Sequence, residues 1–343
     1  MKYSLYLDGI PTEELPAIAA RAERAGFRDL LKAETIYGDA VSACAAMAMT
    51  TRTLRVGSGI AGVYGRSALV FAMSAAALAR LSGGRFILGL GLQSQRYVEG
   101  WHGARYEGMS GFRDRLRTIR SLLAGEAWNG YHLAFPPPAP VPIYIAALGP
   151  KMIELAGELA DGLLGYFYTR AYIEEIVRPR VEAGARRAGR SSADFDLTWG
   201  LPVLVSDDPR ARDLMRAQVV MYATAASKSY DLIMQTSGFG DALDDLRRRL
   251  ARARTMDDVA PAVSDEMLDA FTLCGTPAEV RKRLADFARA GVSTLYLFPI
   301  PPGHFHPLFK GHFPDALPVP DPDLDGLRKN IEATLGLMED AHA

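Results

Sequence analysis

The sequence contains two cysteines, no long apolar run and no surplus of either charge. Cys44 and Cys274 lie far apart and neither belongs to a C-x-x-C pair, which argues against a redox dithiol, a disulfide or a metal site built on cysteine. No apolar run reaches the roughly 18 residues that a transmembrane helix needs, because the richest stretch, 68–81, is shorter and contains Ser74. The first residues alternate polar and apolar side chains, unlike a signal peptide. We therefore expect a soluble, cytoplasmic protein with no membrane partner.

Histidine is also scarce, with six in the chain. Three of them, His304, His306 and His312, lie close together in a proline-rich stretch. No cysteine or acidic residue supports them closely, so no metal site is predicted there.

The charges are balanced, with 39 lysines and arginines against 40 aspartates and glutamates and a net charge of −1. A nucleic-acid-binding face needs a surplus of positive charge, so nucleic acid is not an expected partner. The basic run at 247–249 is interleaved with aspartates and is typical of a solvated helix face. Apolar residues make up 49% of the chain, which excludes disorder and indicates a globular protein.

Short strand-like runs alternate with longer helical ones along most of the chain. Strands are predicted at residues 2–8, 27–32, 54–60, 86–91, 142–148, 162–167, 197–205 and 294–298. Helices are predicted at residues 12–25, 40–49, 68–81, 112–123, 151–160, 172–188, 209–226 and 277–290. Such alternation implies parallel strands joined by right-handed crossovers, and this number of strands favours an α/β fold of the (β/α)8, or TIM, barrel type.

A doubly wound Rossmann sheet is the competing fold, and the glycine pattern disfavours it. The fingerprint G-x-G-x-x-G should follow the first strand. The sequence there is DGIP at 8–11, and the GLG at 89–91 has only two of the three glycines.

The 343 residues exceed the roughly 250 of a minimal barrel by about 90. The surplus falls in segments that break the strand–helix pattern, at 92–110, 125–141, 227–266 and beyond 299. We interpret the first and third as insertions after strands four and seven that cover the barrel mouth. The last is a proline-rich tail with a final helix near 324–337. We therefore predict a single domain over 1–343, with a core of about 2–299 and a C-terminal tail at 300–343.

In a barrel of parallel strands, functional residues gather after the carboxyl ends of the strands. Glu34, at the end of a buried strand, needs a partner to stay charged, and Lys32 or Arg66 could serve. The glycine-rich stretch 59–65 indicates either a backbone that a ligand approaches closely or a flexible loop. His102 lies in the insertion after strand four, where it is either a substrate contact or a surface residue.

The segment 146–151 carries the clearest local indication of a ligand. Its small residues allow close approach, and Pro150 suits the first turn of a helix. The free amides of that turn point outward beside Lys151, an arrangement that fits a phosphate or another anion. An ordinary loop that ends at a helix start is the alternative.

Several motifs in combination resemble the bacterial luciferase-like superfamily. They are SGGRFILGLG at 82–91, VYGRS at 63–67, VEGWHG at 98–103 and PIYIAALGPKM at 142–152, followed by LAGELADG at 155–162. The resemblance covers residues 2–299, and the most similar branch is that of the coenzyme F420-dependent oxidoreductases related to methylenetetrahydromethanopterin reductase.

The resemblance implies a (β/α)8 barrel, usually a homodimer, that holds a flavin or deazaflavin at its C-terminal mouth. It implies a non-prolyl cis peptide behind the cofactor ring, at Gly59-Ile60, and a phosphate at the segment 147–151, in agreement with the anion argument. The residues expected to bind the cofactor are Glu34, Gly59, Ile60, Ala61, Gly91, Leu92, Gln93, Ala147, Leu148, Gly149, Pro150 and Lys151.

Two positions depart from the family's pattern. Relatives often carry histidine after the strand-two carboxylate, but Thr35 stands here, and threonine cannot act as a general acid near neutral pH. The proton then comes from Tyr37, Tyr64, Arg66 or His102, or the reaction needs none. The predicted catalytic residues are Glu34, Tyr64, Arg66 and His102. The second departure is Leu92-Gln93, where close relatives often place small hydroxyl residues.

We predict an oxidoreductase that uses reduced F420 to transfer hydride to or from a small organic substrate at the barrel mouth. One alternative is an FMN-dependent monooxygenase whose insertions keep water from the flavin. The other is a non-catalytic binding protein on the same barrel, which the threonine at position 35 motivates. Incubation with each cofactor separates the three.

Overall fold

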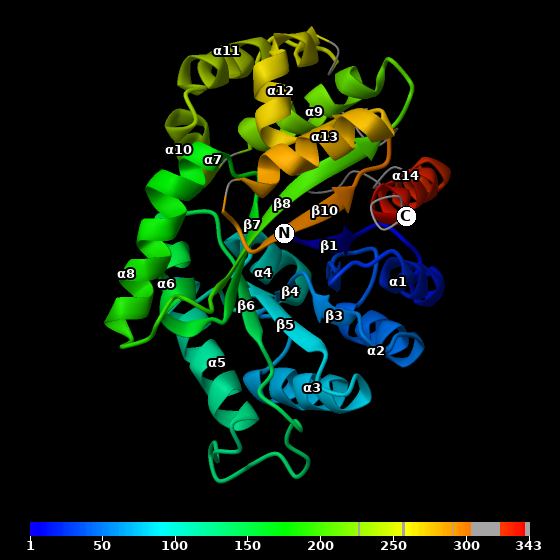
Figure 1. Cartoon of the computed structure of the whole chain (residues 1–343). Coiled ribbons are helices and arrows are strands. Elements are labelled where there is room, and N and C mark those ends of the chain that lie inside the picture. Colours follow the sequence, from blue (N-terminus) through cyan, green and yellow to red (C-terminus); the bar gives the residue numbers. More distant parts are fainter. Residues whose placement is uncertain (226, 256–257, 290, 303–322, 340–343) are drawn as a thin grey trace. The chain divides into compact units, whose positions relative to one another are not determined.

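The computed structural model describes residues 1–225, 227–255, 258–289, 291–302 and 323–339 (Figure 1). The chain divides into two compact units. The N-terminal unit comprises Lys2–Leu164 and Arg180–Thr198, and the C-terminal unit comprises Met1, Gly165–Pro179 and the chain from Trp199 onward. A single domain over 1–343 stays a prediction.

The strands of the N-terminal unit are parallel. They are β1 (Lys2–Leu7), β2 (Asp29–Lys32), β3 (Arg55–Ser58), β4 (Ala61–Gly62), β5 (Phe86–Gly91), β6 (Ile143–Ala146) and the first residues of β7 (Gly162–Tyr166). Strand β5 is buried along its whole length, because its apolar side chains and glycines are covered on both faces. Since the strands are parallel, their carboxyl ends meet at one edge of the sheet.

Helices connect these strands. They are α1 (Leu15–Arg24), α2 (Ala40–Thr50), α3 (Ala68–Leu81), α4 (Gln95–His102), α5 (Gly108–Leu123), α6 (Pro150–Leu159) and most of α8 (Arg178–Arg187). Asp39 and Ser67 are the N-caps of α2 and α3, because their side chains accept hydrogen bonds from amides in the first turn of each helix. Gly103, with φ of 58°, ends α4 in the left-handed region that glycine favours.

The C-terminal unit contains the other main strands and helices, except that the first three residues of β8 lie in the N-terminal unit. They are α7 (Arg170–Tyr172), β8 (Asp196–Val205), α9 (Ala211–Ala223), α10 (Lys228–Thr236), α11 (Gly240–Leu250), α12 (Asp265–Phe271), β9 (Leu273–Gly275), α13 (Pro277–Ala288), β10 (Thr294–Pro299) and α14 (Leu324–Glu339). The tail helix α14 is held by buried Asn330, whose amide group donates to the carbonyl oxygens of Val203 and Ile300 at 2.7 and 2.8 Å. The predicted final helix is therefore present and packs against the ends of strands.

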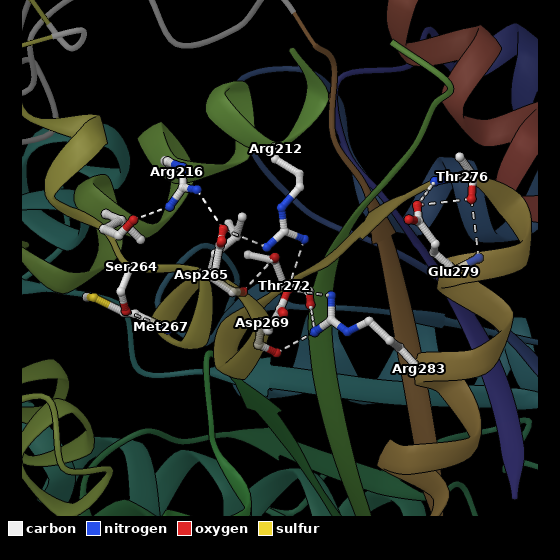
Figure 2. Close-up of polar contacts among 12 residues, drawn as sticks. Arg212, Arg216, Ser264, Asp265, Met267, Asp269, Thr272, Thr276, Glu279 and Arg283 are labelled. Carbon is white, nitrogen blue, oxygen red and sulfur yellow. Dashed lines mark hydrogen bonds and ion pairs between the residues drawn. The ribbon is translucent and has the colours of Figure 1, made fainter. Parts of the chain in front are cut away.

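Ion pairs join α12 to both α9 and α13 in the same unit (Figure 2). Arg212 and Arg216 both contact the carboxylate of Asp265, at 2.9 and 2.7 Å. Arg212 and Arg283 share the carboxylate of Asp269, each at 3.1 Å. The pairs between α9 and α12 hold the two ends of the insertion that follows β8 together, because their residues are 49 to 57 positions apart in the sequence.

The predicted fold class is confirmed. Strands β1, β2, β3, β5, β6, β7, β8 and β10 coincide with the predicted ones, and their alternation with helices is that of a (β/α)8 barrel. The sequence did not indicate β4, β9 or α12. It also did not indicate α4, α10 and α11, which fall in segments interpreted as irregular insertions. None of the helices in the described part of the chain combines the length and the hydropathy that crossing a bilayer requires.

Candidate functional site

The carboxyl ends of β2, β3, β4 and β5 bring several predicted site residues together. The amide of Glu34 donates to the carbonyl oxygen of Ile60 at 3.2 Å, and the amide of Val63 donates to that of Gly91 at 3.0 Å. The backbone after β2 is thus fixed to the backbone after β3, and β4 to the end of β5. We call this edge of the N-terminal unit the rim.

An ion pair at the rim joins the loops after β2 and β4. Nη1 of Arg66 donates to Oε1 of Glu34 at 2.7 Å, and Nη2 contacts the carboxylate of Asp39. Burial lowers the pKa of Arg66, but the hydrogen bond to Glu34 and the charges of both carboxylates outweigh it and raise that pKa above its usual value. The guanidinium therefore stays charged, and Arg66, rather than Lys32, is the partner of Glu34.

The peptide bond between Gly59 and Ile60 is cis, as the family resemblance implies. The Ile60 side chain lies against Gly91, where an added Cβ would come within 1.8 Å of its Cδ1 atom. Ile60 is partly exposed, so it offers an apolar surface at the rim. Gly91 is required for this close approach, since any side chain there would displace Ile60.

Gln93 links the end of β5 to α4. Its backbone has φ of 59°, and its side chain covers Gly62, where an added Cβ would lie 2.0 Å from Oε1. The same oxygen is 3.1 Å from Nε2 of His102. A carboxamide oxygen accepts, so in this arrangement Nε2 carries the proton and Nδ1 is left as the acceptor. His102 is thereby held at the rim beside Gly65.

Tyr64 is turned toward α5. Its hydroxyl donates to the carbonyl oxygen of Gly108 at 3.0 Å, and its ring lies 4.8 Å below the guanidinium of Arg115. Burial raises the pKa of Tyr64 above its usual value. The hydroxyl and ring of this predicted catalytic residue thus contact residues at and within α5, and its predicted role stays untested.

The predicted anion segment begins helix α6. Gly149 precedes the helix, Pro150 is its first residue, and the carbonyl oxygen of Gly149 accepts from the amides of Met152 and Ile153. The opening amides of a helix have no partner within it and carry partial positive charge. The side chain of Lys151 is exposed beside them. The pairing of Leu90 with Ile145 puts this segment next to the end of β5, where Gly91 and Leu92 lie.

Sequence reasoning missed two acidic residues at or beside the rim. Asp39 is the second partner of Arg66, and Asp8, after β1, interacts with Lys32 and Thr35. Lys32 is completely buried. The position of Asp8 immediately after the first strand was the available signal, because functional residues of a parallel barrel gather after the carboxyl ends of its strands.

None of the predicted site residues lines either of two cavities, of about 710 and 660 Å³, in the described part of the chain. We assign the site to the rim because the ionisable and apolar groups converge there. Among the described residues, no group of three His, Cys, Asp or Glu side chains could hold a metal ion. His304, His306 and His312 lie outside the described residues.

Comparison with known proteins identifies the family. A family model described as luciferase-like monooxygenase matches residues 4–294. The 5,10-methylenetetrahydromethanopterin reductase of Methanolobus tindarius is 30% identical over 297 residues, which cover 83% of this chain and 90% of that protein. The reductase of the same name from Archaeoglobus fulgidus is 32% identical over 262 residues, covering 72% and 77%.

A solved structure agrees with the fold. The coenzyme F420 dependent tetrahydromethanopterin reductase from Methanopyrus kandleri superposes with a TM-score of 0.70 at 21% identity, covering 87% of this chain and 92% of that one. The rim residues described above lie within the matched segment of the family model. The chain therefore belongs to the luciferase-like monooxygenase family, and it is an oxidoreductase similar to the methylenetetrahydromethanopterin reductases.

Proposed function

We propose that the protein binds coenzyme F420 at the rim and transfers hydride between it and a small organic substrate. The observation that carries the proposal is the rim itself, where the Glu34–Arg66 ion pair lies beside the apolar Ile60. The start of α6 with Lys151 follows the neighbouring strand. The relatives named as reductases, one of them F420 dependent, support the choice of cofactor.

The residues present fit a ring with an anionic tail. Ile60 and Gly91 would form an apolar wall for the ring, and Lys151 with the opening amides of α6 would hold a phosphate. When bound, reduced F420 supplies the hydride. The chain would supply orientation and charge, because Arg66 remains a cation that can stabilise negative charge on the substrate.

Titration of the purified protein with F420 and with FMN tests the cofactor. We expect saturable F420 binding at micromolar concentration and reduction or oxidation of the bound cofactor by a small organic compound. Tight FMN binding without F420 binding would favour the FMN-dependent monooxygenase. Binding of neither would favour a non-catalytic protein.

Replacement of Lys151 by methionine is expected to weaken F420 binding about tenfold to a hundredfold. The change removes one charge-assisted hydrogen bond to a phosphate, which contributes about 1.5–3 kcal/mol. Fluorescence titration gives both dissociation constants. Lys228→Met, at another exposed lysine, is the matched control and should leave the affinity unchanged. If Lys151→Met bound F420 as tightly as the wild type, the proposed phosphate site at this segment would be contradicted.

We also propose that the protein is a homodimer in the cytoplasm that pairs through α2 and α3. These helices carry apolar residues on all sides, and Met49, Val70, Met73 and Leu81 are exposed by 68, 43, 53 and 51%. A helix that is apolar all round is normally covered. Light scattering that gives only the monomer mass at micromolar concentration would contradict the dimer.

A further inference from the structure

A cavity of about 710 Å³ in the C-terminal unit is lined by α12, α13 and the loop after β7. Its volume lies within the range of small-molecule sites, roughly 300–1,000 Å³. Residues from α9, β8, β9 and the segment between α10 and α11 complete the lining. None of them belongs to the rim, so an occupant of this cavity would use a different set of residues from the proposed cofactor.

A chain of ion pairs ends in this cavity. Arg216 and Arg212 both contact the carboxylate of Asp265, and Arg216 has a further acidic partner in the solvent-exposed Asp213, at 3.3 Å. Figure 2 shows Arg212 of α9 and Arg283 of α13 turned toward Asp269, whose Oδ1 they share. Arg283 lines the cavity and, unlike Arg216, has no second carboxylate among the described residues. The chain is therefore least compensated at its cavity end.

The hydrogen bonds of Arg283 leave part of its guanidinium available. Nη2 donates to the carbonyl oxygens of Asp269 and Thr272, the second at 2.7 Å, which fixes the group at the end of α12. Nη1 lies near Asp269 without a hydrogen bond, and Nε donates to no residue in the described part of the chain. Burial lowers the pKa of Arg283 below its usual value, and the charge of Arg212 adds to this effect against that of Asp269. An anion beside Arg283 would compensate this charge.

Aromatic rings line the cavity beside the same guanidinium. Cζ of Arg283 lies 5.7 Å from the centroid of the Phe287 ring, one turn further along α13. The rings of Phe287 and Trp199 meet edge to face at 4.7 Å. Trp199 is buried and fixed, because its Nε1 donates to the carbonyl oxygen of Tyr168 at 3.1 Å. A cation next to two rings fits a guest that carries an anionic group on a planar apolar body.

The acidic side chains of the lining limit the charge of such a guest. They are Glu266, Asp269, Glu279 and Asp286. Glu279 accepts hydrogen bonds from Thr276, and Asp286 pairs with Arg289, which lies outside the lining. These carboxylates would repel a dianion more strongly than a monoanion. Lys282 is exposed, has no ion pair with a described residue and offers a second cation in the lining.

We propose that this cavity binds a small aromatic carboxylate, with the carboxylate at Arg283 and the ring against Phe287 and Trp199. The site is additional to the rim, and the inference does not depend on the proposed F420-dependent function. Arg283 supplies a charge-assisted hydrogen bond from its unused guanidinium edge, and Lys282 supplies a second positive charge.

Isothermal titration calorimetry of the full chain with 2-naphthoate tests the proposal. We expect one-to-one binding with a dissociation constant of about 10 µM to 1 mM. The neutral 2-naphthamide has nearly the same shape and should bind about tenfold to a hundredfold more weakly, because it lacks the charge. No binding of 2-naphthoate, or equal affinities for the two compounds, would overturn the proposal. Tighter binding of 2-naphthyl phosphate would overturn the choice of a carboxylate.

Variants of the lining locate the bound compound. Arg283→Met should weaken 2-naphthoate binding about tenfold to a hundredfold, and Lys282→Met about threefold to tenfold. Ala270→Phe fills the cavity from α12 without a change of charge and should abolish binding, which keeps the test decisive if Arg283→Met fails to fold. Arg252→Met, at an exposed arginine outside the lining, is the matched control and should bind as the wild type does. Unchanged affinity in folded Ala270→Phe and Lys282→Met would overturn the assignment to this cavity.

Discussion

Replacing Arg66 by methionine is expected to lower F420-dependent turnover by a factor of about a hundred to a thousand, the cost typical of losing one preorganised charge at a reacting centre. The Arg66 side chain is 20% exposed and Glu34 only 14%, so solvent does not substitute for the lost guanidinium. The change also leaves the carboxylates of Glu34 and Asp39 unpaired, and we expect it to reduce the free energy of unfolding by about 1–3 kcal/mol.

The double variant Arg66→Met with Glu34→Gln separates the two effects. It should recover part of the lost free energy of unfolding, because the partly buried charge is gone, but none of the turnover. Chemical denaturation and steady-state kinetics measure the two quantities. Arg210→Met, which breaks the exposed pair with Asp208, is the control and should change neither. Recovery of turnover in the double variant would show that Arg66 acts only on stability.

Gly89→Ala is expected to reduce the free energy of unfolding by about 3 kcal/mol or more, or to prevent folding. An added Cβ would lie 2.0 Å from the carbonyl oxygen of Ser58 and 3.1 Å from Cδ1 of Leu164. The Ser58 hydroxyl donates to the carbonyl oxygen of Gly89 at 2.8 Å, and the amide of Gly89 donates back to that hydroxyl at 3.0 Å. The methyl group must therefore separate β3 from β5, and overpacking against backbone is not relieved by a rotamer change.

Urea denaturation compares Gly89→Ala with Gly336→Ala in α14, where an added Cβ meets nothing within 4 Å. The control variant should be as stable as the wild type or more stable by up to about 1 kcal/mol, since alanine favours the helical conformation. A similar stability for the two variants would mean that β3 and β5 tolerate a wider separation. Loss of F420 binding in Gly89→Ala is expected alongside, because Gly59 and Ile60 follow Ser58 directly.

The strands could be predicted from the sequence because their apolar runs are bounded by glycine or proline and recur with helices between them. The run at 86–91 is the clearest case, being buried on both faces. The insertion helices α10 and α11 were missed because both are short and α11 is rich in charged residues. In retrospect Leu243, Leu246 and Leu250 have helical spacing and are all buried, so part of the signal was present.

The site was predictable only where a local motif specifies geometry. The helix start after Gly149 was predicted from Pro150 and the small residues before it, the cis peptide at Gly59-Ile60 was implied by the family resemblance, and both are present. The Asp8–Lys32 interaction joins residues that are 24 positions apart and depends on the pairing of β1 with β2. Which side chains pair at the ends of neighbouring strands depends on the register of those strands, and the sequence alone does not specify it. For this reason the sequence analysis left Glu34 with two possible partners.

Because Lys32 is completely buried, the chemical reactivity of its amine measures how often the structure around it opens locally. Reagents that acylate primary amines need solvent contact and a neutral nitrogen, and Lys32 offers no exposed surface to them. Exposed lysines such as Lys151 should be modified at once, whereas Lys32 should react only when the ends of β1 and β2 come apart. Mass spectrometry of its peptide during timed labelling would therefore report the opening of this edge separately from global unfolding, without any inserted probe.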